Sequence, residues 1–427
     1  MQKVKFAKLP FPLMTLVTAL AAFGCYTSMY AFRKAFTAGD FSQPMLWGVD
    51  YKVWLVVAQV VGYMLSKFYG IRFIAEKGQD KRAVKILSLI GIAWLALFGF
   101  AIVPAPYNIL FMFINGLPLG MIWGLVFSYL EGRRTTELLG AVMSISLVFA
   151  SGFVKTIART FMELVPISVY WMPFMMGLLF VVPLVLCNLL LEFVPPPDDR
   201  DRALRTARAP MNALERKQFL LTFLPGLLFA IIPYIIITVL RDLRDNFEVE
   251  IWADIGITDK HIYAQTDSII ALVVLLLISS LILVKNNLKA FTLIHVMIIG
   301  GCLLTGVSTW LFQLQLISNV VWMSLGGLGI YLAYIPYNAI FFERLLATFR
   351  FGGNIGFIMY VADSVGYLGS VGVLIMHELS DIKLSWGHFF VQTTMATASL
   401  AGVLALFSLI YFRHKKLSYP AVRTSMH

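Results

Sequence analysis

Residues 11–36 read FPLMTLVTALAAFGCYTSMYAFRKAF, an almost wholly apolar stretch that ends in Arg33 and Lys34. It is long enough for an α-helix to cross the hydrocarbon core of a bilayer. Similar stretches recur to the end of the chain, and hydrophobic residues make up 59% of its 427 residues against 13% charged ones. This composition excludes an ordinary soluble domain and predicts an all-α, polytopic membrane protein.

The apolar stretches predict twelve transmembrane helices in two six-helix bundles. They are expected at residues 11–36, 53–74, 84–103, 107–129, 138–163, 170–193, 219–245, 264–284, 290–312, 317–342, 352–376 and 388–412. One long hydrophilic stretch, residues 194–218, opens with three prolines and carries both signs of charge. We therefore expect an N-terminal bundle over residues 1–193, a linker over 194–218 and a C-terminal bundle over 219–427.

Basic residues are unevenly divided between the two sides of the predicted membrane. Those in loops are concentrated on the side of the two termini, whereas the opposite loops carry only Lys52, Lys260 and Lys383. The positive-inside rule then places both termini, and the linker, in the cytoplasm. The placement of the positive charges, which give a net charge of +11, thus reports the orientation of the chain in the membrane. We expect the lipid bilayer as a partner, and no nucleic acid. Since no organelle-targeting segment is visible, we expect a bacterial inner membrane. We also expect a monomer.

Two arginines occupy matching places in the two halves. Arg33 lies near the outer end of the first span and Arg241 near that of the seventh, and each follows a tyrosine by seven residues, Tyr26 and Tyr234. Seven residues are two helical turns, so each ring shares a face with its guanidinium. An arginine within a bilayer costs about 2.5–3.5 kcal/mol even on insertion scales. The matched pairs therefore indicate an anion site between parallel halves, as in a transporter.

Less specific readings stay open for these cations. Arg33 and Lys34 could reach the outer lipid headgroups, and Lys67 could extend to the inner ones. Arg241 could instead be neutralised by Asp245, four residues later on the same helix.

Asp363 lies eleven residues into the eleventh span, near the bilayer centre. A carboxylate there is a functional-site hypothesis by default. It could carry a proton and couple symport of a carboxylate or sugar. It could equally be the fixed partner of Arg241 or Lys155.

Four short stretches stand out within the predicted spans: Tyr26-Thr-Ser-Met-Tyr30-Ala-Phe-Arg33-Lys34, Gly62-Tyr63-Met64-Leu65-Ser66-Lys67-Phe68, Leu240-Arg241 and Gly366-Tyr367-Leu368-Gly369. They resemble segments of the organophosphate:phosphate antiporters of the major facilitator superfamily, which exchange glycerol phosphate or hexose phosphate for phosphate. The resemblance implies that Arg33 and Arg241 bind a phosphate-like anion, while Lys34 and Lys67 add positive potential. The family's fifth-helix histidine has no counterpart here, and Lys155 is the candidate for a related role. Tyr26, Tyr30 and Tyr234 are expected to shape the pocket.

Other classes of function find little support in the sequence. No Ser/His/Asp, His-rich or HExxH-type constellation is present, and no nucleotide-binding loop indicates a pump. We therefore expect no catalytic residue, no metal and no cofactor, and we expect that the protein is not an enzyme. A non-transporting membrane sensor ranks below transport because the linker of 25 residues leaves little room for a signalling domain. The leading prediction is secondary active transport of a small organic anion, a phosphate ester or phosphonate.

Overall fold

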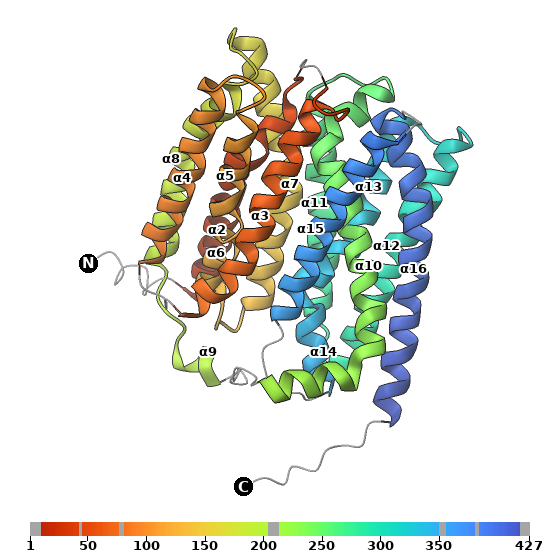
Figure 1. Ribbon diagram of the computed structural model, residues 1–427. Helices are drawn as coiled ribbons and strands as arrows, with labels where there is room; N and C mark the ends of the chain where they lie inside the picture. Colours follow the sequence, from red (N-terminus) through yellow and green to blue (C-terminus); the bar gives the residue numbers. More distant parts are fainter. Residues whose placement is uncertain are drawn as a thin grey trace.

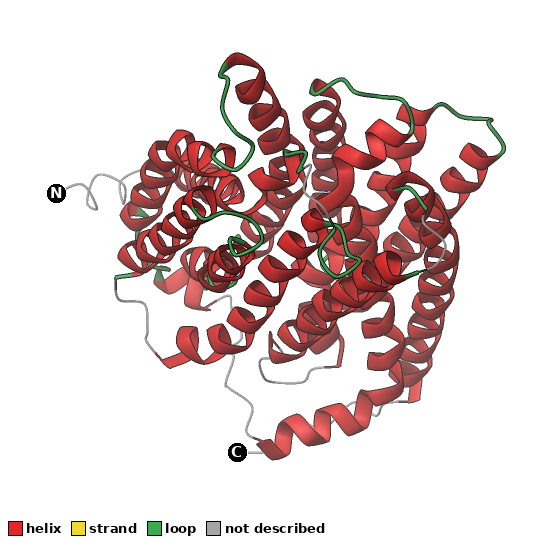
Figure 2. Cartoon of the chain, turned by 45° about the horizontal axis from the view of Figure 1, so that its top comes forward, coloured by secondary structure: helices red, strands yellow, loops and turns green. Residues whose placement is uncertain are grey.

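The computed structural model describes residues 10–41, 45–76, 81–203, 213–349, 356–380 and 384–418. Within these ranges the chain is built from helices, without a β-strand, and the loops join the helix ends (Figures 1 and 2). The first half contains α2 (Phe11–Lys34), the 3₁₀ turn η1 (Ala35–Ala38), α3 (Tyr51–Glu76), α4 (Arg82–Ile102), α5 (Ile109–Leu119), α6 (Ile122–Leu130), α7 (Thr136–Leu164) and α8 (Met172–Phe193).

The second half follows the short helix α9 (Asp199–Ala203). It contains α10 (Ala213–Asp254), α11 (His261–Ile282), α12 (Asn287–Gln313), α13 (Asn319–Pro336), the π-helical turn η2 (Tyr337–Phe341), α14 (Phe342–Phe349), α15 (Gly356–Leu379) and α16 (Trp386–Ser418). Figure 1 shows the first half, red to yellow, on the left and the second half, green to blue, on the right. We call the end of the molecule away from α9 and α14 the outer end.

The helices account for the predicted membrane crossings. Ten helical segments among the described residues are long and apolar enough to span a bilayer. The helices α3 and α15, of 26 and 24 residues, take the second and eleventh positions. The predicted fold class, an all-α membrane protein of twelve helices in two bundles, is thereby confirmed. The chain is a multi-pass integral membrane protein.

The halves meet along two helix pairs, α7 with α11 and α3 with α15. Small residues allow the close approach that association between membrane helices needs. A Cβ atom on Gly152 of α7 would lie 2.2 Å from the carbonyl oxygen of Tyr263 in α11. This packing brings the polar residues of α2, α3 and α7 beside those of α10 and α15.

Some predicted boundaries were wrong. The seventh helix does not end at residue 245 but continues to Asp254, with a break in helical geometry at Phe247. The tenth span extends to Phe349 and the twelfth to Leu417. Part of the predicted linker is helical, as α9 and the start of α10, while residues 204–212 lie outside the described part. The division of the chain at this linker remains a prediction.

Candidate anion site between the two halves

Arg33 is the least compensated charge in the centre of the protein. Its side chain is 2% exposed, and its Cζ lies 3.8 Å from the ring centre of Tyr63, 5.8 Å from that of Tyr30 and 5.9 Å from that of Tyr367. Its Nε has no hydrogen-bond partner, and among the described residues no carboxylate forms an ion pair with it. Burying a charge without a counter-ion is costly, so this guanidinium is suited to hold an anion.

Arg241 approaches the same tyrosine from the other half. Its Nη2 donates to the Tyr367 hydroxyl at 3.3 Å, and its Cζ lies 4.5 Å from the ring centre of Tyr334. The neighbouring carboxylate of Asp242 lies 3.6 Å from the same Nη2. The alternative of an Arg241–Asp245 pair does not occur, because the carboxylate of Asp245 faces two lysines of the first half.

Asp363 forms an ion pair with Lys67 of α3, which joins the two halves. Pairing with Arg241 or Lys155, one of the alternatives considered for Asp363, is not what the structure shows. Tyr234 donates a hydrogen bond to the other carboxylate oxygen of Asp363, and Asn338 in turn donates to the Tyr234 hydroxyl at 3.2 Å. Lys67 is predicted to add positive potential to the cavity. The carboxylate of Asp363 neutralises this charge and so reduces that contribution.

Tyrosine rings enclose these charged groups. Tyr63 and Tyr367 pack edge to face with their centres 5.3 Å apart, and Tyr26 and Tyr30 lie next to each other on α2 at 6.0 Å. Tyr234 stacks on Tyr334 at 5.6 Å. Two-turn spacing predicted that Tyr234 and Arg241 share a face, and both indeed contact Tyr334. We call the set of Tyr30, Tyr63, Tyr334 and Tyr367 the tyrosine cage.

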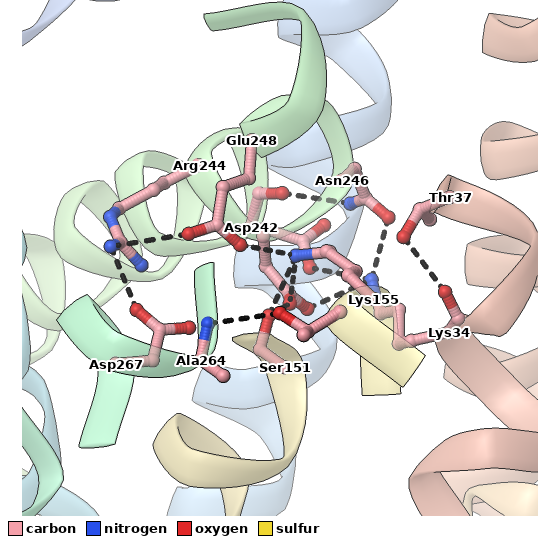
Figure 3. A network of polar contacts seen from close by, with 12 residues as sticks. Lys34, Thr37, Ser151, Lys155, Asp242, Arg244, Asn246, Glu248, Ala264 and Asp267 are labelled. Carbon is pink, nitrogen blue, oxygen red and sulfur yellow. Dashed lines mark hydrogen bonds and ion pairs between the residues drawn. The ribbon is translucent and has the colours of Figure 1, made fainter. Parts of the chain in front are cut away.

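Lys34 and Lys155 belong to a separate network at the outer end (Figure 3). Lys34 Nζ donates to Asn246 Oδ1 at 2.6 Å and lies 3.0 Å from Asp245 Oδ2. Lys155 Nζ donates to Glu248 Oε2 and to Ser151 Oγ, both at 2.7 Å. Both lysines are fully buried.

These contacts bear on the roles expected for the two lysines. Each is paired with carboxylates of α10, which offset the positive potential that these lysines are predicted to add to the cavity. They link α2 and α7 of the first half to α10 of the second.

The outer network continues on both sides of these lysines. Arg244 Nη2 lies 2.8 Å from Asp267 Oδ1 and 3.4 Å from Glu248 Oε1. Lys52 of α3 forms an ion pair with Glu250 of α10. The pairs of Lys34, Lys52 and Lys155 with carboxylates of α10 hold the two halves together at the outer end, whereas the pairs of Arg244 lie within the second half.

The inner end has a smaller link between the halves. Arg344 of α14 lies 2.9 Å from the carboxylate of Glu137 at the start of α7. Its other terminal nitrogen donates to Asn287 at 2.8 Å. Because these side chains are partly exposed, this link is weaker than the buried outer network.

Several site residues were missed from the sequence. Tyr331, Tyr334 and Tyr337 recur every three residues, a spacing that places side chains on one helical face. This signal could have pointed to Tyr334. The residues from Asn246 to Glu250 were missed because the seventh span was predicted to end before them.

The chain matches one family model, and its fold is similar to those of solved transporter structures. The model of a family described as a family of unknown function (DUF5690) matches residues 35–415. No curated protein matches the chain. A crystal structure of a D-xylose-proton symporter is similar with a TM-score of 0.60 and 14% identity, over 97% of this chain and 99% of that one.

Two further solved structures are similar to the same extent. The nucleoside transporter NupG has a TM-score of 0.59 and 15% identity, over 93% of this chain and 99% of its own. A POT family transporter in complex with 5-aminolevulinic acid has a TM-score of 0.60 and 11% identity, over 94% and 96%. At such identities the likeness shows the fold alone, and it is consistent with the predicted class.

Proposed function

The chain belongs to the family of unknown function DUF5690, and we propose that it is a secondary transporter that moves a small organic anion by alternating access. The fold it shares with the sugar, nucleoside and POT family transporters supports transport in general. Such proteins place their sites near the membrane midplane, between the halves. Arg33, Arg241 and the tyrosine cage lie between the halves of this chain.

The observation that carries the proposal is the unpaired guanidinium of Arg33. The other buried cations around it, Lys34, Lys67, Arg241 and Lys155, each have a carboxylate within 4 Å. A bound anion would supply the counter-charge that Arg33 lacks, and it would also reach Arg241 beside Tyr367. Binding to one arginine from each half would draw the halves together, which couples binding to alternating access.

A phosphate ester or phosphonate is the substrate class we propose, in exchange for phosphate. Pairs of phosphate oxygens match the planar fork of a guanidinium, and charge-assisted bonds of this kind are strong. The antiporter-like residues around Arg33 and Arg241 support the same class. We further propose that the termini and linker are cytoplasmic, in a bacterial inner membrane, and that the bundles of residues 1–193 and 219–427 move relative to each other.

A second candidate is favoured by the pair between Lys67 and Asp363. This pair joins the halves beside the tyrosine cage, where a change in the protonation of Asp363 would act on the contact between them. The alternative function is proton-coupled symport of a carboxylate or sugar. It predicts accumulation driven by a pH gradient without phosphate on the opposite side of the membrane.

Counterflow in proteoliposomes tests the first candidate. Vesicles preloaded with phosphate receive labelled glycerol phosphate at two pH values, with wild type, Arg33→Gln, Arg241→Gln and the surface control Lys260→Gln. Loss of a group that binds a buried charge costs about 2–5 kcal/mol, so each arginine variant should lose roughly thirtyfold or more of the exchange rate. The control should exchange normally. Undiminished exchange in both arginine variants would refute the two-arginine site.

A further inference from the structure

Lys67 and Arg33 share one pair of aromatic rings. Lys67 Nζ lies 5.1 Å from the ring centre of Tyr63 and 4.9 Å from that of Tyr367. Arg33 Cζ lies 3.8 Å and 5.9 Å from the same two centres. The carboxylate of Asp363, which is bound to Lys67, is therefore a near neighbour of the site proposed for the substrate anion.

The charges in this part of the protein nearly cancel. Arg33, Lys67 and Arg241 contribute three positive charges. Asp363 neutralises Lys67 directly, and Asp242 lies 3.6 Å from Arg241. The charge left over is the single positive charge of Arg33. Lys34 also lies 4.0 Å from Asp242, but the outer network adds no excess charge, because its four cations are matched by four other carboxylates: Lys34 by Asp245, Lys52 by Glu250, Lys155 by Glu248 and Arg244 by Asp267.

We infer that Asp363 acts as a built-in anion that limits the substrate to a single negative charge. The inference rests on the proposed function and narrows it to monoanionic heads, such as a phosphate ester or phosphonate in its singly ionised form or a phosphodiester. A dianion would bring a second negative charge into a buried site that has one positive charge to offer. It would also compete with Asp363 for Lys67, and a buried charge without a partner is strongly disfavoured.

The contacts of Asp363 hold it in place beside the proposed anion site. One of its oxygens binds Lys67 and the other accepts the hydrogen bond from Tyr234, whose hydroxyl is held by Asn338. These partners come from α3, α10 and η2. Asp363 is thus held directly by α3 and α10, with Asn338 of η2 holding the Tyr234 hydroxyl, and it sets the charge of the site as a positioned group of the protein.

A pair of ligands that differ by one methyl group tests the inference. Dimethyl phosphate carries one negative charge, whereas methyl phosphate at pH 8 carries nearly two, since its second pKa is about 6. Binding is measured by calorimetry on the full chain in nanodiscs. Wild type should prefer dimethyl phosphate. Asp363→Asn should shift the preference toward methyl phosphate by roughly tenfold or more, because one buried negative charge has been removed.

A double variant and a pH series separate charge from folding. Lys67→Gln with Asp363→Asn removes both members of the pair and should restore the preference of wild type. Glu163→Gln, which removes a negative charge at the exposed pair with Lys260, should leave it unchanged. In wild type, methyl phosphate should bind more tightly relative to dimethyl phosphate at pH 5 than at pH 8. This last comparison needs no variant.

The outcomes are distinct. If both ligands bind but Asp363→Asn leaves their ratio unchanged within a factor of two, the inference is overturned while the anion site stands. If the ratio does not change with pH in wild type, the inference is likewise overturned. If neither ligand binds to well-folded wild type or variants, the proposed phosphate-type site fails, and the inference falls with it.

Discussion

Removal of the Lys155 ammonium should open the outer end of the protein. In Lys155→Met the side chain keeps its length but loses its charge, and Glu248 and Asp245 each lose one partner. Glu248 keeps Arg244 at 3.4 Å and Asp245 keeps Lys34 at 3.0 Å. Breaking a buried ion pair costs about 3–5 kcal/mol, and the remaining partners place this variant at the lower end, ~3 kcal/mol.

This cost falls on one conformation only. When the halves separate at the outer end, the same charges meet water, so the loss of Lys155 destabilises the closed state alone. A difference of ~3 kcal/mol changes the ratio of closed to open molecules by roughly 150-fold. A population of open molecules too small to detect in wild type should therefore become measurable.

Distances between two spin labels measure this opening. Tyr107 and Leu316 are 74% and 67% exposed and lie in outer loops of opposite halves, so cysteines at these positions can carry the labels. Lys155→Met should add a longer distance to the distribution. Lys260→Met, which removes the exposed pair with Glu163, is the matched control and should change little, since surface pairs contribute about 0–1 kcal/mol.

Two results would contradict the reasoning. One is a distance distribution in Lys155→Met identical to that of wild type. The other is an equal change in both lysine variants, which would indicate that burial of the pair does not matter. The double variant Lys155→Met with Glu248→Leu should close the outer end again, because apolar replacement of a buried pair is often neutral or stabilising.

Three further predictions concern other contacts. In Gly152→Val the new Cβ atom would lie 2.2 Å from the backbone oxygen of Tyr263, so α7 and α11 should separate and the spin-label distances should lengthen. Unchanged distances and an unchanged transport rate would contradict this prediction. Arg344→Gln removes the pair with Glu137 and should favour opening at the inner end by up to about 1 kcal/mol, seen as faster alkylation of an inner-end cysteine. Burial raises the pKa of the Asp50 carboxyl, just before α3, above its ordinary value. The folded state therefore binds this proton more tightly than the unfolded state, and the free energy of unfolding falls as pH rises above about 4. Asp50→Asn should flatten this dependence of the melting temperature on pH, and an unaltered slope would exclude the effect.

Local sequence patterns predicted one part of the candidate site and missed another. The matched spacing of Tyr26 with Arg33 and of Tyr234 with Arg241 singled out two arginines that the fold brings to one ring, with their Cζ atoms 5.9 Å and 5.7 Å from the ring centre of Tyr367. Their function as an anion site is still a prediction. The same patterns did not predict the partners of Lys34 and Lys155: both lysines lie near Asp245, the last residue of the predicted seventh span, and Lys155 also pairs with Glu248, beyond the end that the hydropathy pattern gave to this helix.

The sequence by itself determined the class of this protein: apolar stretches of membrane length, their number, and the side on which basic loops gather. These follow from hydropathy and helical period, which are properties of neighbouring residues. Only the tertiary structure decided which charge meets which. Lys155 meets Glu248 across 93 residues, and Lys67 meets Asp363 across 296. Such partners depend on the rotation and crossing of helices from two bundles, and packing between the bundles fixes these, not the pattern along either helix.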